Sequence, residues 1–191
     1  AQKIPLSVIF EDNDLLVIDK PAGMVVHPGA GHPQGTLLNA LLYAYPSNQH
    51  LPRAGIVHRL DKDTSGLLMV AKSEISFNHL TQALAKRCID RWYYACVDGT
   101  VHSSGEYEAP VRRHPYHRQK MAVHPQGKPA RTSWDVQQRL QGYTLLRLKL
   151  YTGRTHQIRV HMQALGHPLL GDTTYGRHRG YQKLTAHAAA V

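Results

Sequence analysis

The stretch IVHRLDKDTSGLLMVAK, Ile56–Lys72, contains a largely apolar segment that leads to Asp61, a short polar turn and a second apolar segment. The first segment is apolar at Ile56, Val57 and Leu60, which predicts that it is buried. DKDTSG has the composition of a turn, and LLMVAK predicts a strand. Asp61 is therefore expected in a loop fed by one strand and leaving into another. Catalytic groups are common at such positions because the scaffold is rigid and the loop is accessible.

Two interpretations of Asp61 remain open from the residues alone. A single aspartate in a loop often makes an Asx-turn, or an ion pair with neighbours such as Arg59 and Lys62. Asp63, which precedes Thr-Ser-Gly, fits the turn role better. Asp61 is then less easily explained by local structure, and it becomes a candidate for chemistry.

The segments on either side of this stretch predict more strands than helices. Thr36 and Ser73 each precede a helical pattern, and Thr155 is expected to cap a third helix within residues 153–168. Alternating or aromatic-rich segments predict strands on both sides of a turn at residues 11–14, and at residues 89–99, 131–140 and 143–152. The expected fold class is α+β, with a mixed, largely antiparallel central sheet flanked by helices and loops. We expect one domain over residues 1–191.

The chain is strongly basic, with 23 Lys and Arg against 13 Asp and Glu in 191 residues, a net charge of +10. This excess indicates a polyanionic partner, with nucleic acid ahead of an acidic membrane surface; a charge that serves solubility alone is the alternative. The segment VRRHPYHRQK, residues 111–120, mixes cations with a tyrosine and histidines, which suits stacking and phosphate contacts on RNA. Residues 136–171 contain no acid, and they carry Arg139, Arg147, Lys149, Arg154 and Arg159.

Several other classes of site are not supported by the sequence. The glycines between residues 29 and 35 miss the dinucleotide-binding spacing, and there is no phosphate-binding GxxxxGK[ST] or nucleophile-elbow GxSxG motif. His156 and His161 are five residues apart without a nearby acid, so we expect no metal. Cys88 and Cys96 are expected to be buried thiols in a reduced compartment. No segment is long and apolar enough to span a bilayer, so we expect a cytoplasmic protein with no membrane contact.

An ordered set of segments gives a more specific hypothesis. They are EDNDLLVIDKPAGMVVHPG, HPQGTLLNALL, HRLDKDTSGLLMVAK, MAVHPQGKPARTSW, TGRTHQIRVHMQALGHPLLGDTTYG and LTAHA. Together they resemble the RluA family of RNA pseudouridine synthases, and most closely its RluD-like branch, which acts on large-subunit ribosomal RNA. The resemblance covers nearly the whole chain. It implies the pseudouridine synthase catalytic fold and an isomerase that flips uridines out of RNA, cleaves the glycosidic bond and rejoins the base through carbon.

The resemblance also implies site residues. Asp61 matches the catalytic aspartate of the family, Tyr93 the tyrosine that packs against the target base, and Arg159 the basic residue that pairs with the aspartate. Arg59 matches the arginine that enters the space vacated by the flipped uridine, and Arg154 is a rival for the pairing with Asp61. The expected RNA-binding residues are Arg59, Arg154, His58, Lys62, Arg112, Arg113, Arg118 and Lys120.

The chain departs from the family pattern at its C-terminal end, where Ala186 stands in place of a leucine that packs against the base. We expect that an N-terminal accessory RNA-binding domain and the C-terminal end of the catalytic domain are missing. The resemblance implies a monomer without cofactor or metal, with ribosomal RNA as the expected partner and tRNA as the alternative. A noncatalytic RNA-binding or ribosome-assembly protein on the same fold is a competing hypothesis, and a base-excising glycosylase is a third.

Overall fold

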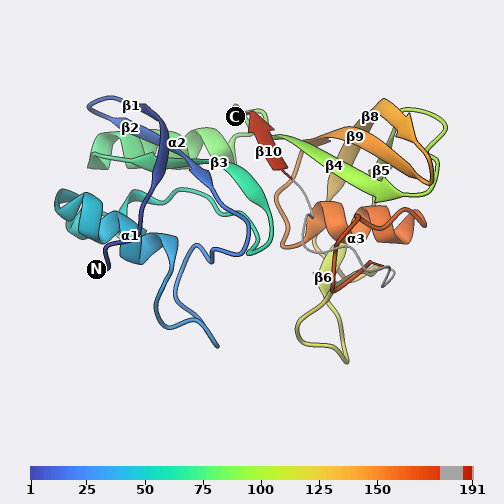
Figure 1. Cartoon of the computed structure of the whole chain (residues 1–191), viewed down its shortest axis with the longest axis horizontal. Coiled ribbons are helices and arrows are strands. Elements are labelled where there is room, and N and C mark those ends of the chain that lie inside the picture. The colour runs from blue at the N-terminus through green and yellow to red at the C-terminus, as the bar shows by residue number, and fades with distance from the viewer. Residues whose placement is uncertain (177–186, 191) are drawn as a thin grey trace. The chain divides into compact units, whose positions relative to one another are not determined.

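The computed structural model describes residues 1–176 and 187–190, and it divides the chain into two compact units. The first is Ala1–Ile89 and the second is Asp90–Val191. We describe each unit by itself (Figure 1). The single catalytic domain expected from the sequence stays a prediction.

The first unit contains three antiparallel strands and two α-helices. The strand β2 (Leu15–Lys20) pairs on one side with β1 (Ser7–Glu11) and on the other with β3 (Ser65–Ala71). The helices are α1 (Leu37–Ala44) and α2 (Glu74–Ala85), and two short 3-10 helices, η1 (Pro46–His50) and η2 (Pro52–Gly55), follow α1. Thr36 and Ser73 cap α1 and α2 through reciprocal side-chain and backbone hydrogen bonds, so both predicted helix starts are confirmed.

The strand expected before Asp61 is absent from the described structure. Only Ile56 forms a bridge, with Val70 on β3, and residues 57–64 run as a loop. The backbone at Arg53 and Ala54 is left-handed, with φ of 53° at both residues, so the chain is kinked just before Ile56. The segment therefore pairs with β3 through one bridge and not as a strand.

Both faces of this sheet carry buried residues on β2 and β3, whereas the residues of β1 are exposed. On one face, Phe77, Leu80 and Leu84 of α2 pack with Met69 and Ala71 of β3. The alternate residues of the strands lie on the opposite face and are almost fully buried: Leu16, Ile18, Lys20, Leu68 and Val70. A lysine thus occupies a position in the apolar row of β2.

In the described residues of the second unit, five antiparallel strands pair in the order β10-β4-β9-β8-β5. The strands are β4 (Trp92–Asp98), β5 (Gly105–Glu108), β8 (Arg131–Leu140), β9 (Tyr143–Leu150) and β10 (His187–Ala190). A separate hairpin pairs β6 (Val111–Arg113) with β7 (Met121–Val123), and its loop contains most of the basic segment 111–120. In Figure 1 this loop projects away from β4, β8 and β9.

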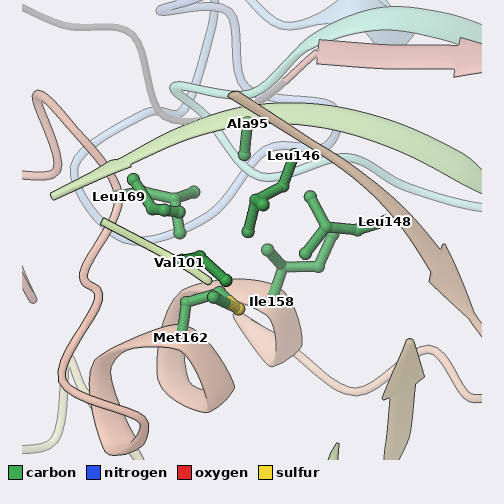
Figure 2. Close-up of a cluster of buried hydrophobic side chains, with 8 residues drawn as sticks. Ala95, Val101, Leu146, Leu148, Ile158, Met162 and Leu169 are labelled. Carbon is green, nitrogen blue, oxygen red and sulfur yellow. The ribbon is translucent and has the colours of Figure 1, made fainter. Parts of the chain in front are cut away.

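The helix α3 (Gln157–Ala164) packs on the sheet of the second unit. Ile158 and Met162 point from α3 toward Leu146 and Leu148 of β9, in a cluster that also includes Ala95, Val97, Val101 and Leu169 (Figure 2). The predicted cap at Thr155 is wrong. His156 is the N-cap residue, with a left-handed φ of 55° and no side-chain capping bond, because its ring contacts Tyr175 instead.

The predicted α+β class with antiparallel pairing is confirmed by these elements. The prediction that both thiols are buried is wrong for Cys88, which is exposed after the end of α2, while Cys96 is half-buried on β4. The departure at Ala186 lies outside the described residues.

Candidate functional site

Asp61 opens a tight turn in the first unit. The Thr64 N–H donates to the Asp61 carbonyl at 3.2 Å, so Lys62 and Asp63 occupy the two central positions. Asp63 therefore belongs to the turn, as predicted. The Asp61 side chain is half-buried at the entrance of the same turn.

The side chain of Lys20 holds the backbone of this turn in place. Its side chain is fully buried, and its Nζ donates to the carbonyls of Pro21 and Met24 at 2.9 Å and of Lys62 at 3.1 Å. The Gly23 N–H donates to the same Lys62 carbonyl at 2.8 Å. Burial lowers the pKa of the Lys20 ammonium to about 8, although three carboxylates act in the opposite direction: Asp63, Asp61 and Asp19. A buried cation thus fixes the backbone beside Asp61.

The other predicted residues of this loop differ in their roles. The Met69 N–H donates to His58 Nε2 at 2.9 Å, which joins the loop to β3 and gives His58 a structural role. Lys62 Nζ lies 3.0 Å from His32 Nε2 on the surface. Arg59 is exposed. Burial, followed by the positive charges of Arg53 and Arg59, lowers the pKa of His27.

In the second unit, Arg159 forms a buried ion pair with Asp172. Arg159 Nε is 2.7 Å from Asp172 Oδ2, and Nη2 is 2.9 Å from Oδ1. Asp172 Oδ1 also accepts hydrogen bonds from the N–H groups of Thr174 and Tyr175. Burial alone raises the pKa of Asp172, but the hydrogen bond and charge of Arg159, together with these two backbone bonds, outweigh it and lower the pKa. The predicted pairing of Arg159 with Asp61 stays a prediction.

Tyr175 lies between Arg159 and the basic hairpin. The guanidinium carbon of Arg159 is 4.9 Å from the centre of the Tyr175 ring, and Lys120 Nζ is 6.0 Å from it. The Tyr175 hydroxyl accepts a hydrogen bond from the Met121 N–H at 2.6 Å and is 2.7 Å from His156 Nδ1.

Tyr93 occupies the core-facing side of β4, where it packs against the apolar cluster under α3. Trp92 and Tyr94 alternate to the opposite face, as expected for sheet-face aromatics. The guanidinium of Arg147 lies 4.4 Å from the Trp92 ring centre and Lys149 Nζ lies 5.3 Å from it, so this face is covered by cation–π contacts.

The basic hairpin presents its predicted RNA-binding cations near a polar hollow. Arg112 Nη1 donates to Gln126 at 2.8 Å, Arg113 donates to the Arg118 carbonyl, and Arg118 is exposed. A cavity of about 820 Å³ lies between the hairpin loop and the segment 173–176. Its walls include Tyr116, His117, Arg118, Lys120, Gln163 and Tyr175.

The cations of the acid-free segment are largely engaged within the second unit. Arg147 pairs with Asp135 at 3.1 Å and Lys149 with Asp90 at 2.8 Å. Arg139 donates to the carbonyls of Val101 and His102, and Arg154 Nε donates to the Pro129 carbonyl at 3.0 Å. These contacts give the cations structural roles, and the expected RNA contact of Arg154 stays a prediction.

His161 has a structural role. It is fully buried, with Nδ1 at 3.0 Å from Thr132 Oγ1 and Nε2 at 3.0 Å from the Ala109 carbonyl. Burial lowers its pKa, which favours the neutral ring. Gln157, also buried, bonds to the Thr132 hydroxyl and to that of Thr152, which extends this network to the start of α3.

Within residues 1–176 and 187–190, no three His, Cys, Asp or Glu side chains gather in a group that could hold a metal ion. No helix in the same part of the chain has the length and apolar character needed to cross a membrane.

The family is established by comparison with known proteins. The model of the family described as RNA pseudouridylate synthase matches residues 14–164, and the chain therefore belongs to this family. Among solved structures, human RNA pseudouridylate synthase domain containing 1 superposes with a TM-score of 0.79 at 28% identity, covering 98% of this chain and 78% of the other. The human domain containing 4 protein shares the fold, with a TM-score of 0.74 at 23% identity over 95% of this chain and 82% of the other.

More similar relatives carry a more specific name. The chain is 56% identical over 175 residues to ribosomal large subunit pseudouridine synthase D of Haemophilus ducreyi. It is 55% identical to the protein of that name in Yersinia pestis and 53% identical to that in Escherichia coli O6:H1, again over 175 residues. These alignments cover 92% of this chain and 54% of each relative, so the chain spans about half the length of the curated relatives it matches. The predicted resemblance is thus confirmed.

Three residues with a part in these contacts had no predicted role: Lys20 in the first unit, and Asp172 and Tyr175 in the second. A signal existed for Lys20, because it shares the alternation of Leu16 and Ile18 on a strand. Asp172 and Tyr175 lie in LLGDTTYG, a segment that carried the family resemblance, but their partners come from distant residues and could not be assigned from spacing.

Proposed function

We propose that the chain is the catalytic part of an enzyme that isomerises uridine to pseudouridine in large-subunit ribosomal RNA. The observation that carries the proposal is the identity of about 55% to proteins named for that activity, along 92% of the chain. Family membership and the exposed basic hairpin support it. A protein with this substrate works where ribosomal RNA is, so a cytoplasmic location belongs to the proposal, together with action as a monomer.

The reaction breaks the bond between N1 of uracil and C1′ of ribose and forms a bond between C5 and C1′. The C5 proton is released and N1 gains a proton, so the product is an isomer of the substrate. The target must first leave the RNA stack, which costs a few kcal/mol for unstacking. We assign Arg59 to the vacated space, because it is exposed beside the Asp61 turn.

We assign the chemistry at the sugar to Asp61, as nucleophile or as base. No water has to be activated, so a second catalytic carboxylate of the kind used by glycoside hydrolases is not required. A nearby cation supplies the countercharge of a carboxylate. Arg159 has that role in the proposal, and Tyr93 packs against the detached base so that water is excluded.

We assign the grip on RNA to cations near the two sites. On the hairpin these are Arg112, Arg113, Arg118 and Lys120, and beside Asp61 they are Arg59 and Lys62. His58 is assigned to the same contact as a neutral ring, because its Nε2 accepts the Met69 N–H. Arg154 is a further contact. Contacts with phosphates carry little sequence information, so loop shape and the flipped base set the selectivity. RNA binding is therefore expected to weaken steeply as salt increases.

The test is tritium release from RNA labelled at C5 of uracil, with pseudouridine measured chemically in the same RNA. We expect release by the wild-type protein and none by Asp61→Asn. Asp63→Asn, which removes a charge from the same turn, is the matched control and should retain release. RNA binding by Asp61→Asn should persist and stay salt-sensitive.

The competing functions give different results. Tritium release by a folded Asp61→Asn protein would contradict the mechanism. Binding without release by the wild-type protein would identify a noncatalytic RNA-binding protein, and free uracil among the products would identify a glycosylase.

A further inference from the structure

We propose that Tyr175 is a positioning residue that joins the RNA-binding hairpin to Arg159, so that the hold of the hairpin on RNA sets the orientation of the Arg159 guanidinium. The inference rests on the proposed function, because the role of Arg159 beside the catalytic aspartate is part of it. All the residues concerned belong to the second unit.

The hydroxyl of Tyr175 connects two segments that are far apart in the sequence. The Met121 N–H can only donate, so the tyrosine oxygen accepts this bond at 2.6 Å. The same oxygen lies 2.7 Å from His156 Nδ1, and the tautomer of the imidazole decides which of the two atoms donates. Met121 begins β7, where the hairpin loop ends, and His156 directly precedes α3. One oxygen atom therefore fixes the base of the hairpin and the start of the helix that carries Arg159.

The ring of Tyr175 contacts the cations of both segments. Arg159 follows His156 by three residues, about one helical turn, and its guanidinium lies 4.9 Å from the ring centre. Lys120, in the hairpin loop, has its Nζ 6.0 Å from the same ring. Tyr175 is only 5% exposed, so the ring has little room to move independently of these neighbours.

Asp172, the carboxylate partner of Arg159, belongs to the same short turn as Tyr175. Asp172 accepts a hydrogen bond from the Tyr175 N–H at 3.0 Å, and the Asp172 carbonyl accepts one from the Gly176 N–H at 2.8 Å. Arg159 thus receives both its ion pair and its aromatic contact from one short turn. A shift of Tyr175 would move both contacts together.

The hollow beside the hairpin places RNA within reach of this turn. The cavity of about 820 Å³ and a neighbouring one of about 480 Å³ share four wall residues. These residues are His117, Lys120, Gln163 and Tyr175. RNA that fills the hollow would therefore contact Lys120 and lie against the small exposed edge of Tyr175, and its phosphates would hold the hairpin in the geometry that Tyr175 transmits to Arg159.

Two substitutions separate the contributions of the hydroxyl and the ring. Tyr175→Phe removes the oxygen shared by Met121 and His156 but leaves the ring beside Arg159. We expect RNA affinity to fall and KM to rise by about 5- to 10-fold, the effect of one or two hydrogen bonds, with kcat within about 2-fold of wild type. Tyr175→Leu also removes the ring, and we expect kcat to fall by a further 10-fold or more because Arg159 loses its aromatic contact.

The assays use the full-length protein and an unmodified large-subunit ribosomal RNA transcript. Tyr43→Phe, at an exposed tyrosine of α1, is the control and should match wild type. Affinity is also measured with Tyr175→Phe in the Asp61→Asn background, so this arm does not depend on catalysis. Absence of tritium release by the wild-type protein would refute the proposed function, whereas the affinity arm would still test the connection to the hairpin.

A purely structural role of Tyr175 would lower the fraction of folded protein and leave KM and kcat of the folded protein unchanged. That outcome would overturn the inference, as would equal losses of kcat in the two variants with unchanged KM. If Tyr175→Leu does not fold, unchanged RNA affinity of Tyr175→Phe would still overturn it, and the expected loss of affinity would support it.

Discussion

Replacement of Lys20 by methionine tests whether the turn beside Asp61 is anchored by a buried cation. Methionine has a similar length but no charge and no hydrogen-bond donor. The change removes three hydrogen bonds, at 2.9, 2.9 and 3.1 Å, from a side chain with no exposed surface. The Lys62 carbonyl keeps its bond from Gly23, so the loss falls on the carbonyls of Met24 and Pro21.

Two opposing effects determine the magnitude at pH 7. A buried carbonyl left without a partner costs about 1–3 kcal/mol, and exposure of Pro21 allows water to replace part of that loss. Methionine also removes the free-energy penalty of burying an ammonium group. This penalty is on the order of 3 kcal/mol, because burial lowers the pKa from 10.5 to about 8. We therefore expect the unfolding free energies of Lys20→Met and wild type to agree within about 2 kcal/mol at pH 7.

The decisive result is the dependence on pH. Because the pKa of Lys20 is about 8 in the folded state and 10.5 in the reference state, the unfolded chain binds more protons between these values. The stability of wild type therefore increases with pH in this window, by about 2 kcal/mol from pH 7 to pH 9.5 through Lys20 alone. Lys20→Met lacks this gain, so its stability relative to wild type should fall by that amount.

Urea denaturation at pH 7 and pH 9.5 measures the difference, and other titrating groups cancel between the two proteins. Lys3→Met, at an exposed lysine, is the matched control and should differ from wild type equally at both pH values. A difference between Lys20→Met and wild type that does not change with pH would refute the reasoning, because it would mean that Lys20 is not desolvated as a cation in the folded protein.

Two further substitutions test the ion pair of Arg159 and the backbone of the segment that precedes Asp61. Asp172→Asn leaves Arg159 buried without a countercharge and should lower the unfolding free energy by about 3–5 kcal/mol at pH 7. Because the folded-state pKa of Asp172 is lowered, its stabilisation is present above the unfolded pKa and is lost as the pH falls through the folded pKa. Urea denaturation from pH 7 to pH 3 should therefore show a smaller loss for the variant, and equal losses would contradict the assignment. Gly55→Ala would place a Cβ 2.1 Å from the Ala71 carbonyl oxygen at a φ of 84°, and should cost at least about 2 kcal/mol. Gly142→Ala has a similar φ of 80° but open space, and should cost about 1 kcal/mol; equal costs for the two variants would show that the contact with Ala71 is not limiting.

The parts of the fold that were predicted correctly depend on neighbours in the sequence. Thr36 and Ser73 each bond to a residue three positions ahead, so the signals for α1 and α2 lie within one turn of chain. The start of α3 was misplaced because His156 is held by Tyr175, 19 residues away, in a backbone conformation that its own sequence does not favour. The role of Lys20 was missed for the same reason, since one of its acceptors is 42 residues away.

The distribution of charge follows the same logic, and it changes which cations are available to RNA. The segment 136–171 contains no acid, yet its cations pair with acids that lie close by in the structure. Asp135 and Asp172 lie just beyond its two ends, and Asp90 lies just before β4. A charge count along the sequence therefore overestimates the anion-binding surface of this segment. Arg118, by contrast, is exposed on a loop that projects from the sheet, and Lys120 lies beside the polar hollow. The hairpin, although shorter than the acid-free segment, is thus the stronger candidate for binding RNA. Through Tyr175 the hairpin is also connected to Arg159, so RNA binding there can affect the position of a residue proposed to act beside Asp61.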